Sequence, residues 1–219
     1  MTPLEIVTRA KSGGLDIIGI TDHNSTRQAP EIKRVGEREA LFVLCGAEVT
    51  TREEVHVLVF VDGDKNLEHL QSYLDRYLVK VPNNPDVFGY QLVVDESENV
   101  THQEDYLLIG SIDQSIEELE EFIHSLDGLF IPAHIDKQQN SLLSQLGFVP
   151  KNLKPDALEL SYRISKEDFL RENPYLSGYR FINSSDAHYP QDIGRSYTEL
   201  DINHRSEEHT SELQSRITI

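Results

Sequence analysis

The chain has 219 residues, 38% of them apolar and 26% charged, which is typical of one globular domain. Its formal net charge of −18 would repel the phosphates of long nucleic acids, so we expect no extended nucleic-acid surface. A nucleotide could still enter a metal-lined pocket. No apolar run approaches the roughly 20 residues that span a bilayer, and no basic region precedes an apolar stretch at the N-terminus. We therefore expect a cytoplasmic protein that does not enter the membrane.

The first predicted element is a helix that begins at the first residues. Thr2 and Glu5 have the spacing of a capping box, Pro3 suits the first helical position, and apolar side chains follow at helical spacing. Because α/β barrels and sheets normally open with a strand, we expect that a strand upstream of Met1 has been lost.

The next elements alternate between apolar, β-branched runs and charged helical patterns. We predict a strand over 15–20, a helix over 27–39, strands over 40–49 and 55–61, and a helix over 67–78. The only cysteine, Cys45, lies in an apolar run and is expected to be buried and inert.

Turn residues dominate the segment 82–110, which also has two β-like runs around residues 95–98, so we predict an insertion with a hairpin. A helix over 115–126 and a strand over 129–133 follow. The last predicted elements are a strand over 156–161, a helix near 165–171 and a strand over 180–184. This alternation predicts an α/β fold with a parallel sheet or barrel.

The last fifteen residues look foreign to the protein. Residues 205–215 can be encoded, codon for codon, by a widely used sequencing adapter, and 216–219 would be flanking adapter sequence. We therefore expect one domain over 1–204 and a tail over 205–219 that takes no part in the fold.

Histidines and carboxylates recur at the ends of the predicted strands, where barrels of parallel strands place their active sites. These residues are Asp22, His23, Glu48, His134, Asp186 and His188. Imidazole and carboxylate together suit borderline divalent ions such as Zn²⁺, Mn²⁺ and Fe²⁺, and a carboxylate can bridge two of them. The pattern therefore predicts a metal centre.

Residues 14–24, GLDIIGITDHN, closely resemble a motif of the PHP (polymerase and histidinol phosphatase) family. Four further segments fit the order of that family, namely 46–51, 54–56, 132–134 and 185–188. The resemblance implies a distorted (β/α)7, TIM-like barrel that holds two or three divalent metal ions (Zn, Mn or Fe).

The resemblance also implies a role for each residue. His23 would bind the outer ion, Glu48 would bridge two ions, and His56 and His134 would bind the second. Asp186 would bind the first ion and His188 the third, while Asp22 would orient its neighbour. PHP proteins open with a strand carrying His-X-His, which this chain lacks. We thus expect a barrel without its first strand, and a poorly folded or weakly active chain.

Four cations next to strand ends could meet a phosphate group: Arg52, Lys137, Arg163 and Arg195. Lys137 and Arg163 are the strongest candidates. The resemblance implies hydrolysis of small or nucleotide-sized phosphate esters by a metal-activated hydroxide. Two alternatives stay open: a 5′–3′ exonuclease acting on short oligonucleotides, and a non-catalytic PHP module that binds a partner.

Overall fold

A computed structural model describes residues 1–203 and 212–219. It confirms the first predicted helix. Helix α1 spans Pro3–Ser12, and the Thr2 side chain accepts a hydrogen bond from the backbone N–H of Glu5. Strand β1 spans Ile17–Ile20 and helix α2 spans Ala29–Arg38. In the described part of the chain, no helix has the length and apolarity needed to cross a membrane.

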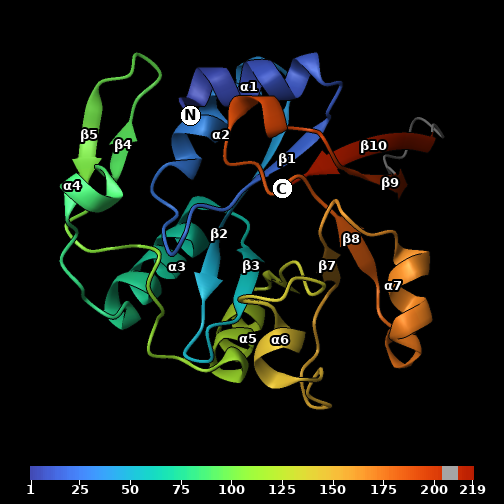
Figure 1. The fold of residues 1–219 in the computed structure, drawn as a ribbon. Helices are drawn as coiled ribbons and strands as arrows, with labels where there is room; N and C mark the ends of the chain where they lie inside the picture. The colour runs from blue at the N-terminus through green and yellow to red at the C-terminus, as the bar shows by residue number, and fades with distance from the viewer. Residues whose placement is uncertain (204–211) are drawn as a thin grey trace.

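The central feature is a curled sheet of six strands in the order β6-β3-β2-β1-β10-β9, with helices on its outer side (Figure 1). Besides β1, its strands are β2 (Phe42–Thr50), β3 (His56–Phe60), β6 (Leu129–Pro132), β9 (Thr198–Asn203) and β10 (Glu212–Thr218). Alternate residues of β2 and β3 are buried in one apolar core with the inner faces of α1 and α2.

The sheet is mixed, although we expected a parallel sheet or barrel, because β3 runs antiparallel to both β2 and β6. Residues 51–55 join β2 to β3 through a tight turn, in which Thr51 accepts a hydrogen bond from Glu54 and donates one to Val55. A connection this short cannot carry a chain back to a parallel position, which takes a dozen or more residues.

A second ribbon pairs β7 (Leu158–Leu160) with β8 (Phe181–Asn183) in parallel. The backbone N–H of Asp156 donates a hydrogen bond to the carbonyl of Phe130 in β6, and the backbone N–H of Asn183 donates one to the hydroxyl of Thr198 at the start of β9. The ribbon thus lies between the two edges of the curled sheet. The remaining helices are α3 (Asp64–Tyr77), α5 (Ile116–Ser125), α6 (Leu142–Leu146) and α7 (Lys166–Glu172), with short 3₁₀ turns at Pro174–Leu176 and Pro190–Asp192.

The predicted hairpin is present in the segment 82–110, as a separate two-stranded sheet on one side of the molecule (Figure 1). It contains α4 (Pro85–Phe88), β4 (Leu92–Val94) and β5 (Val100–Gln103). Two hydrogen bonds join the Gln28 side chain to the backbone of Val94 and hold the hairpin against the start of α2.

The C-terminal segment departs from the expectation that 205–219 takes no part in the fold. Residues 205–211 lie outside the described part, but Glu212–Thr218 form β10, which is parallel to β1 and antiparallel to β9. β10 pairs with β1 only at Ile17 and Ile18. The adapter origin of this segment remains a prediction.

Cys45 is buried, as expected, with 7% of its surface exposed. Burial raises the pKa of its thiol to about 11, so only about one molecule in a thousand carries the reactive thiolate at pH 8. We expect native protein to resist iodoacetamide at pH 8 while the urea-unfolded chain is alkylated within minutes, as mass spectrometry would show. Equal rates in both states would contradict this burial.

Candidate metal centre

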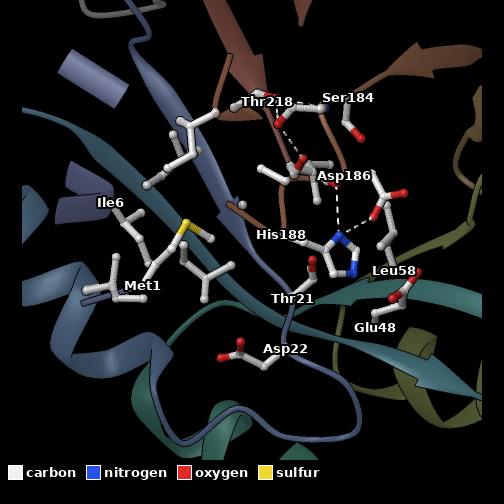
Figure 2. Close-up of a pocket in the computed structure, with 18 of the residues that line it drawn as sticks. Met1, Ile6, Thr21, Asp22, Glu48, Leu58, Ser184, Asp186, His188 and Thr218 are labelled. Atoms are coloured by element: carbon white, nitrogen blue, oxygen red, sulfur yellow. Dashed lines mark hydrogen bonds and ion pairs between the residues drawn. The ribbon is translucent and has the colours of Figure 1, made fainter. Parts of the chain in front are cut away.

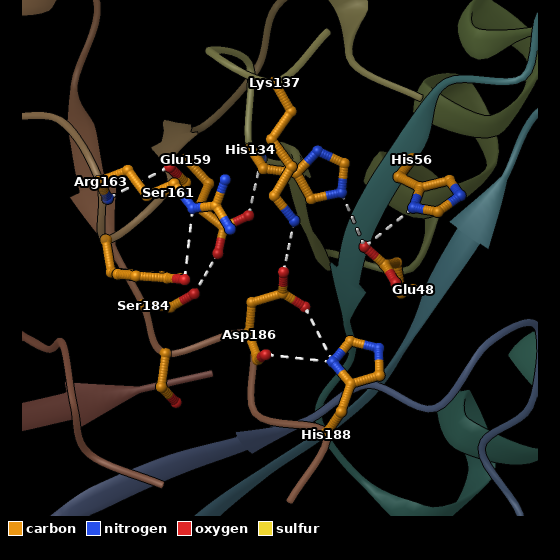
Figure 3. A network of polar contacts seen from close by, with 12 residues as sticks. Glu48, His56, His134, Lys137, Glu159, Ser161, Arg163, Ser184, Asp186 and His188 are labelled. Carbon is orange, nitrogen blue, oxygen red and sulfur yellow. Dashed lines mark hydrogen bonds and ion pairs between the residues drawn. The ribbon is translucent and has the colours of Figure 1, made fainter. Parts of the chain in front are cut away.

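Glu48 lies at the centre of a cluster of three histidines. Its Oε1 is 3.2 Å from Nδ1 of His56 and 3.3 Å from Nε2 of His134, and its Oε2 is 3.3 Å from Nδ1 of His23. Figure 3 shows the contacts of Glu48 with His56 and His134. The side chains of Glu48 and His134 are less than 10% exposed. The structure therefore brings together four of the six predicted ligands.

The strand arrangement explains why these residues meet. β3 runs antiparallel, so His56 at its start lies beside the end of β2, opposite Thr50. The His56 carbonyl accepts a hydrogen bond from Ala133, which places His134 at the same edge of the sheet. After β1, the loop pairs His23 with Glu48 in a parallel bridge. Three strand ends and one strand start thus converge.

The protonation of this cluster suits a cation. Burial alone would favour a neutral Glu48, but hydrogen bonds from His134 and His56 and the nearby imidazoles hold its pKa far below the usual range. Burial lowers the pKa of His23, which favours its neutral form with a free lone pair. Although Nδ1 of His23 lies 3.3 Å from Glu48, it is buried and forms no hydrogen bond with any described residue.

This donor set fits a divalent metal ion. One ligand atom from each of His23, Glu48 and His56 lies within 4.8 Å of the others. Buried polar atoms normally have partners, and an ion bound by the imidazole nitrogen would supply the one that His23 lacks. Two imidazoles and a carboxylate are typical ligands of Zn²⁺, Mn²⁺ and Fe²⁺.

A second polar group adjoins the cluster around Asp186. Its carboxylate is 2.5 Å from Nζ of Lys137 and 3.7 Å from Nδ1 of His188, as Figure 3 shows. The rings of His188 and His23 are 6.4 Å apart between centroids, so the two groups share one opening. The structure therefore places Lys137 in the candidate site, where its ammonium is paired with a predicted metal ligand.

Glu159 was missed by the sequence analysis. It is almost fully buried in β7, where it accepts a 2.8 Å hydrogen bond from the backbone N–H of His134 and another from the Ser184 hydroxyl. Burial raises its pKa to about 7. The sequence does hold a sign of this role, because Glu159 is a carboxylate between Leu158 and Leu160 in an apolar run. Carboxylates are rarely buried unless hydrogen bonds or charges compensate them.

Asn24 was also missed, although it is the last residue of the GLDIIGITDHN motif. It is buried with a positive φ of 45°, and its amide donates hydrogen bonds to the carbonyls of Leu108 and Gly110. Its side-chain oxygen accepts one from the backbone of Thr50. Asn24 thereby fixes the loop that carries His23 to the end of β2 and to the insertion.

Two predicted catalytic residues stand apart from the histidine cluster. Among the described residues, the Asp22 carboxylate makes no hydrogen bond to His23; it is exposed and faces a cavity (Figure 2). The expected role in orienting His23 is therefore not seen. Arg163 is exposed, and its guanidinium donates a hydrogen bond to the Tyr162 hydroxyl and contacts no predicted ligand.

The cavity beside the cluster has a volume of about 310 Å³. One wall is polar and includes Asp22, Glu48, Asp186 and His188, while the opposite wall is apolar and includes Met1 and Ile6 (Figure 2). Its size is that of a small-molecule site. An ester with an apolar part could therefore lie against the metal cluster.

A family model described as PHP-associated matches residues 177–210, a range that contains Asp186 and His188. The resemblance to the PHP family is confirmed. The PHP-associated match extends past residue 204, the expected end of the domain. The chain is also 32% identical over 62 residues to an uncharacterised protein of Methanocaldococcus jannaschii; this stretch covers 28% of the chain and 36% of that protein.

Solved structures with a PHP-like fold include Endonuclease Q in complex with a 27-mer duplex that has an abasic lesion at the active site. The match has a TM-score of 0.66 and 19% identity, and covers 92% of this chain and 49% of that one. A proposed metal-dependent phosphoesterase from Bifidobacterium adolescentis matches with a TM-score of 0.62 and 18% identity, covering 89% of this chain and 86% of that one. At these identities the likeness shows the fold alone.

The chain spans about half the length of Endonuclease Q, and its matched stretch spans about a third of the M. jannaschii protein. The Endonuclease Q structure contains a DNA duplex, so a fold of this kind is compatible with binding DNA. The expectation that this chain has no extended nucleic-acid surface is therefore not supported. The curled mixed sheet agrees with a PHP-type barrel.

Proposed function

We propose that this chain carries the metal centre of a metal-dependent phosphoester hydrolase. The observation that supports this most is the convergence of His23, His56 and His134 on the buried carboxylate of Glu48. Similar folds include a proposed metal-dependent phosphoesterase, which agrees with that chemistry. An ionised carboxylate is costly to bury unless hydrogen bonds or a cation offset its charge, and the imidazole nitrogens around Glu48 are ligand atoms for such a cation.

Six residues would hold the metal ions. Glu48 would be shared between ions, with His56 and His134 on one side of its carboxylate and His23 on the other; Asp186 and His188 would contribute from the adjoining group. We propose two or three divalent ions (Zn, Mn or Fe). When bound, such ions polarise a phosphoryl oxygen and lower the pKa of water.

Lys137 would bind the phosphate group of the substrate. Its ammonium already lies 2.5 Å from Asp186 and is 35% exposed, so a phosphate at the opening could reach it without a large rearrangement. A cation next to the transferred phosphoryl group stabilises the charge that develops in the transition state. Asp22, on the cavity wall, would accept a hydrogen bond from a water molecule in the cavity.

The closure of the curled sheet into a barrel is also part of this proposal. Among the described residues, β10 leaves Gly19 and Ile20 of β1 unpaired on one side, and the cavity lies against the same two residues. We propose that the fold is a distorted (β/α)7 barrel of the PHP type that is open at this edge of β1.

Two kinds of substrate suit this site, namely small phosphate monoesters and the ends of short oligonucleotides. The cavity would admit either, and the DNA duplex in the Endonuclease Q structure favours the second. A non-catalytic PHP module that binds a partner is the alternative from another class. All six expected ligand residues after Met1 are present, which argues against it, because a degraded site usually loses some of its ligands.

The test is metal-dependent turnover of the purified chain. We expect release of inorganic phosphate or of nucleotides from a 5′-phosphorylated hexanucleotide after addition of Mn²⁺ or Zn²⁺, and none in EDTA. Inorganic phosphate would indicate a phosphatase, and nucleoside monophosphates an exonuclease. If the chain bound metal stoichiometrically but released neither product above the metal-free background, the non-catalytic alternative would replace this proposal.

A further inference from the structure

An exposed aromatic ring stacks with an arginine at the opening of the metal centre. The guanidinium carbon of Arg195 lies 3.8 Å from the ring centroid of Tyr162, and that of Arg163 lies 5.4 Å from the same centroid. Tyr162 is 41% exposed although Arg195 stacks on it. The ring therefore retains surface on which a second planar group could stack.

Arg195 joins this ring to the candidate metal site. Its Nε donates a 2.9 Å hydrogen bond to the carbonyl of Ser185, and an Nη lies 3.5 Å from the carbonyl of Asp186. The carboxylate of Asp186 in turn pairs with Lys137. The Arg195 side chain thus lies between Tyr162 and Asp186, a predicted metal ligand.

The ring is also held in place by its own strand end. Ser161, directly before Tyr162, donates hydrogen bonds from its backbone and its hydroxyl to the carboxylate of Asp136, at 2.7 and 2.5 Å. The Ser161 hydroxyl also accepts a hydrogen bond from the backbone of Arg163. A ring on a fixed backbone loses little entropy when a ligand binds.

Two arginines lie against this ring, although the chain has a net charge of −18. The Arg195 guanidinium also pairs with Asp192 at 3.2 Å, while Arg163 forms no ion pair with a described residue. Arginine pairs with phosphate oxygens through its planar fork, and aromatic rings stack with nucleobases of any sequence. Sugar phosphates and inorganic phosphate would use the cations but not the ring.

We propose that Tyr162 is a nucleobase-binding platform, with Arg163 and Arg195 beside it holding the adjacent phosphate of a single-stranded oligonucleotide. This rests on the proposed function, because it names the substrate class of the same opening. It favours the end of an oligonucleotide over a small sugar phosphate as the substrate. Tyr162 would thus determine specificity without taking part in the bond cleavage.

The test is binding in EDTA, which prevents metal-dependent turnover. Fluorescence anisotropy would measure the affinity of a 3′-fluorescein hexathymidylate and of an abasic strand of the same length. We expect Tyr162→Leu to weaken hexathymidylate binding roughly 5- to 100-fold and to leave abasic-strand binding unchanged. Tyr162→Phe, which keeps the ring, should stay within about twofold of the unmodified chain. Arg163→Met should weaken both strands alike.

Tyr90→Leu is the matched control, because Tyr90 is an exposed tyrosine of the insertion that has 69% of its surface free. It should change neither affinity. Equal affinities of Tyr162→Leu and the unmodified chain for hexathymidylate, or an equal loss for both strands, would overturn the platform. Binding is measured without metal, so a failure of metal-dependent hydrolysis would contradict the proposed function and leave this result interpretable.

Discussion

Replacing Glu48 by glutamine is expected to weaken the binding of Zn²⁺ or Mn²⁺ by more than about a hundredfold and to abolish metal-dependent hydrolysis. Even residues that only support metal ligands contribute 10- to 100-fold to affinity, and Glu48 would be a ligand itself. Its carboxylate faces His23, His56 and His134, so Glu48→Gln removes the negative charge that all three imidazoles share. Isothermal titration with metal would measure the loss.

The control for this substitution is Glu120→Gln. Glu120 is also a buried glutamate, 8% exposed, and its carboxylate accepts a hydrogen bond from the backbone of Lys154 on the other side of the core. Glu120→Gln therefore reports what the loss of a buried carboxylate does in general. If Glu48→Gln bound metal as tightly as the control, Glu48 would not be a ligand.

Replacing Glu159 by alanine is expected to lower the free energy of unfolding by about 2–4 kcal/mol. The backbone N–H of His134 and the hydroxyl of Ser184 would both lose their acceptor inside the protein, and a cavity would remain between β7 and the end of β6. His134 has a positive φ of 31°, which that hydrogen bond helps to hold. Urea unfolding followed by circular dichroism would measure the change.

Glutamine at the same position should cost much less, about 1 kcal/mol or below. The amide oxygen can accept from the backbone of His134 while the amide nitrogen donates to Ser184, and no buried charge is needed. Burial raises the pKa of Glu159 to about 7, and so favours the neutral form of its side chain. Alanine and glutamine variants of equal stability would contradict a hydrogen-bonding role for Glu159.

Local signals predicted most elements of the fold but not the direction of the strands. The Thr2 cap and Pro3 placed α1, and the turn residues of 82–110 placed the insertion hairpin. The antiparallel direction of β3 was also visible in the sequence, because only five residues separate the predicted strands 40–49 and 55–61. The alternation of strands and helices favours parallel strands, but a connection of five residues is too short for a parallel crossover.

The site shows the same division between local and tertiary information. The GLDIIGITDHN motif and the spaced histidines led to His23, Glu48, His56 and His134, which the fold brings together. The pairing of Lys137 with Asp186 and the stacking of Arg195 on Tyr162 depend on strand ends far apart in sequence. No sequence spacing encodes such contacts, so only the folded chain reveals them.

The proposed function requires the cluster around Glu48 to bind divalent metal ions. Equilibrium dialysis of the purified chain against Zn²⁺ or Mn²⁺, followed by metal analysis with plasma mass spectrometry, tests it most directly. We predict at least one tightly held ion per chain, and none above background in Glu48→Gln. A folded chain that retained no metal after dialysis against either ion would contradict the proposed function.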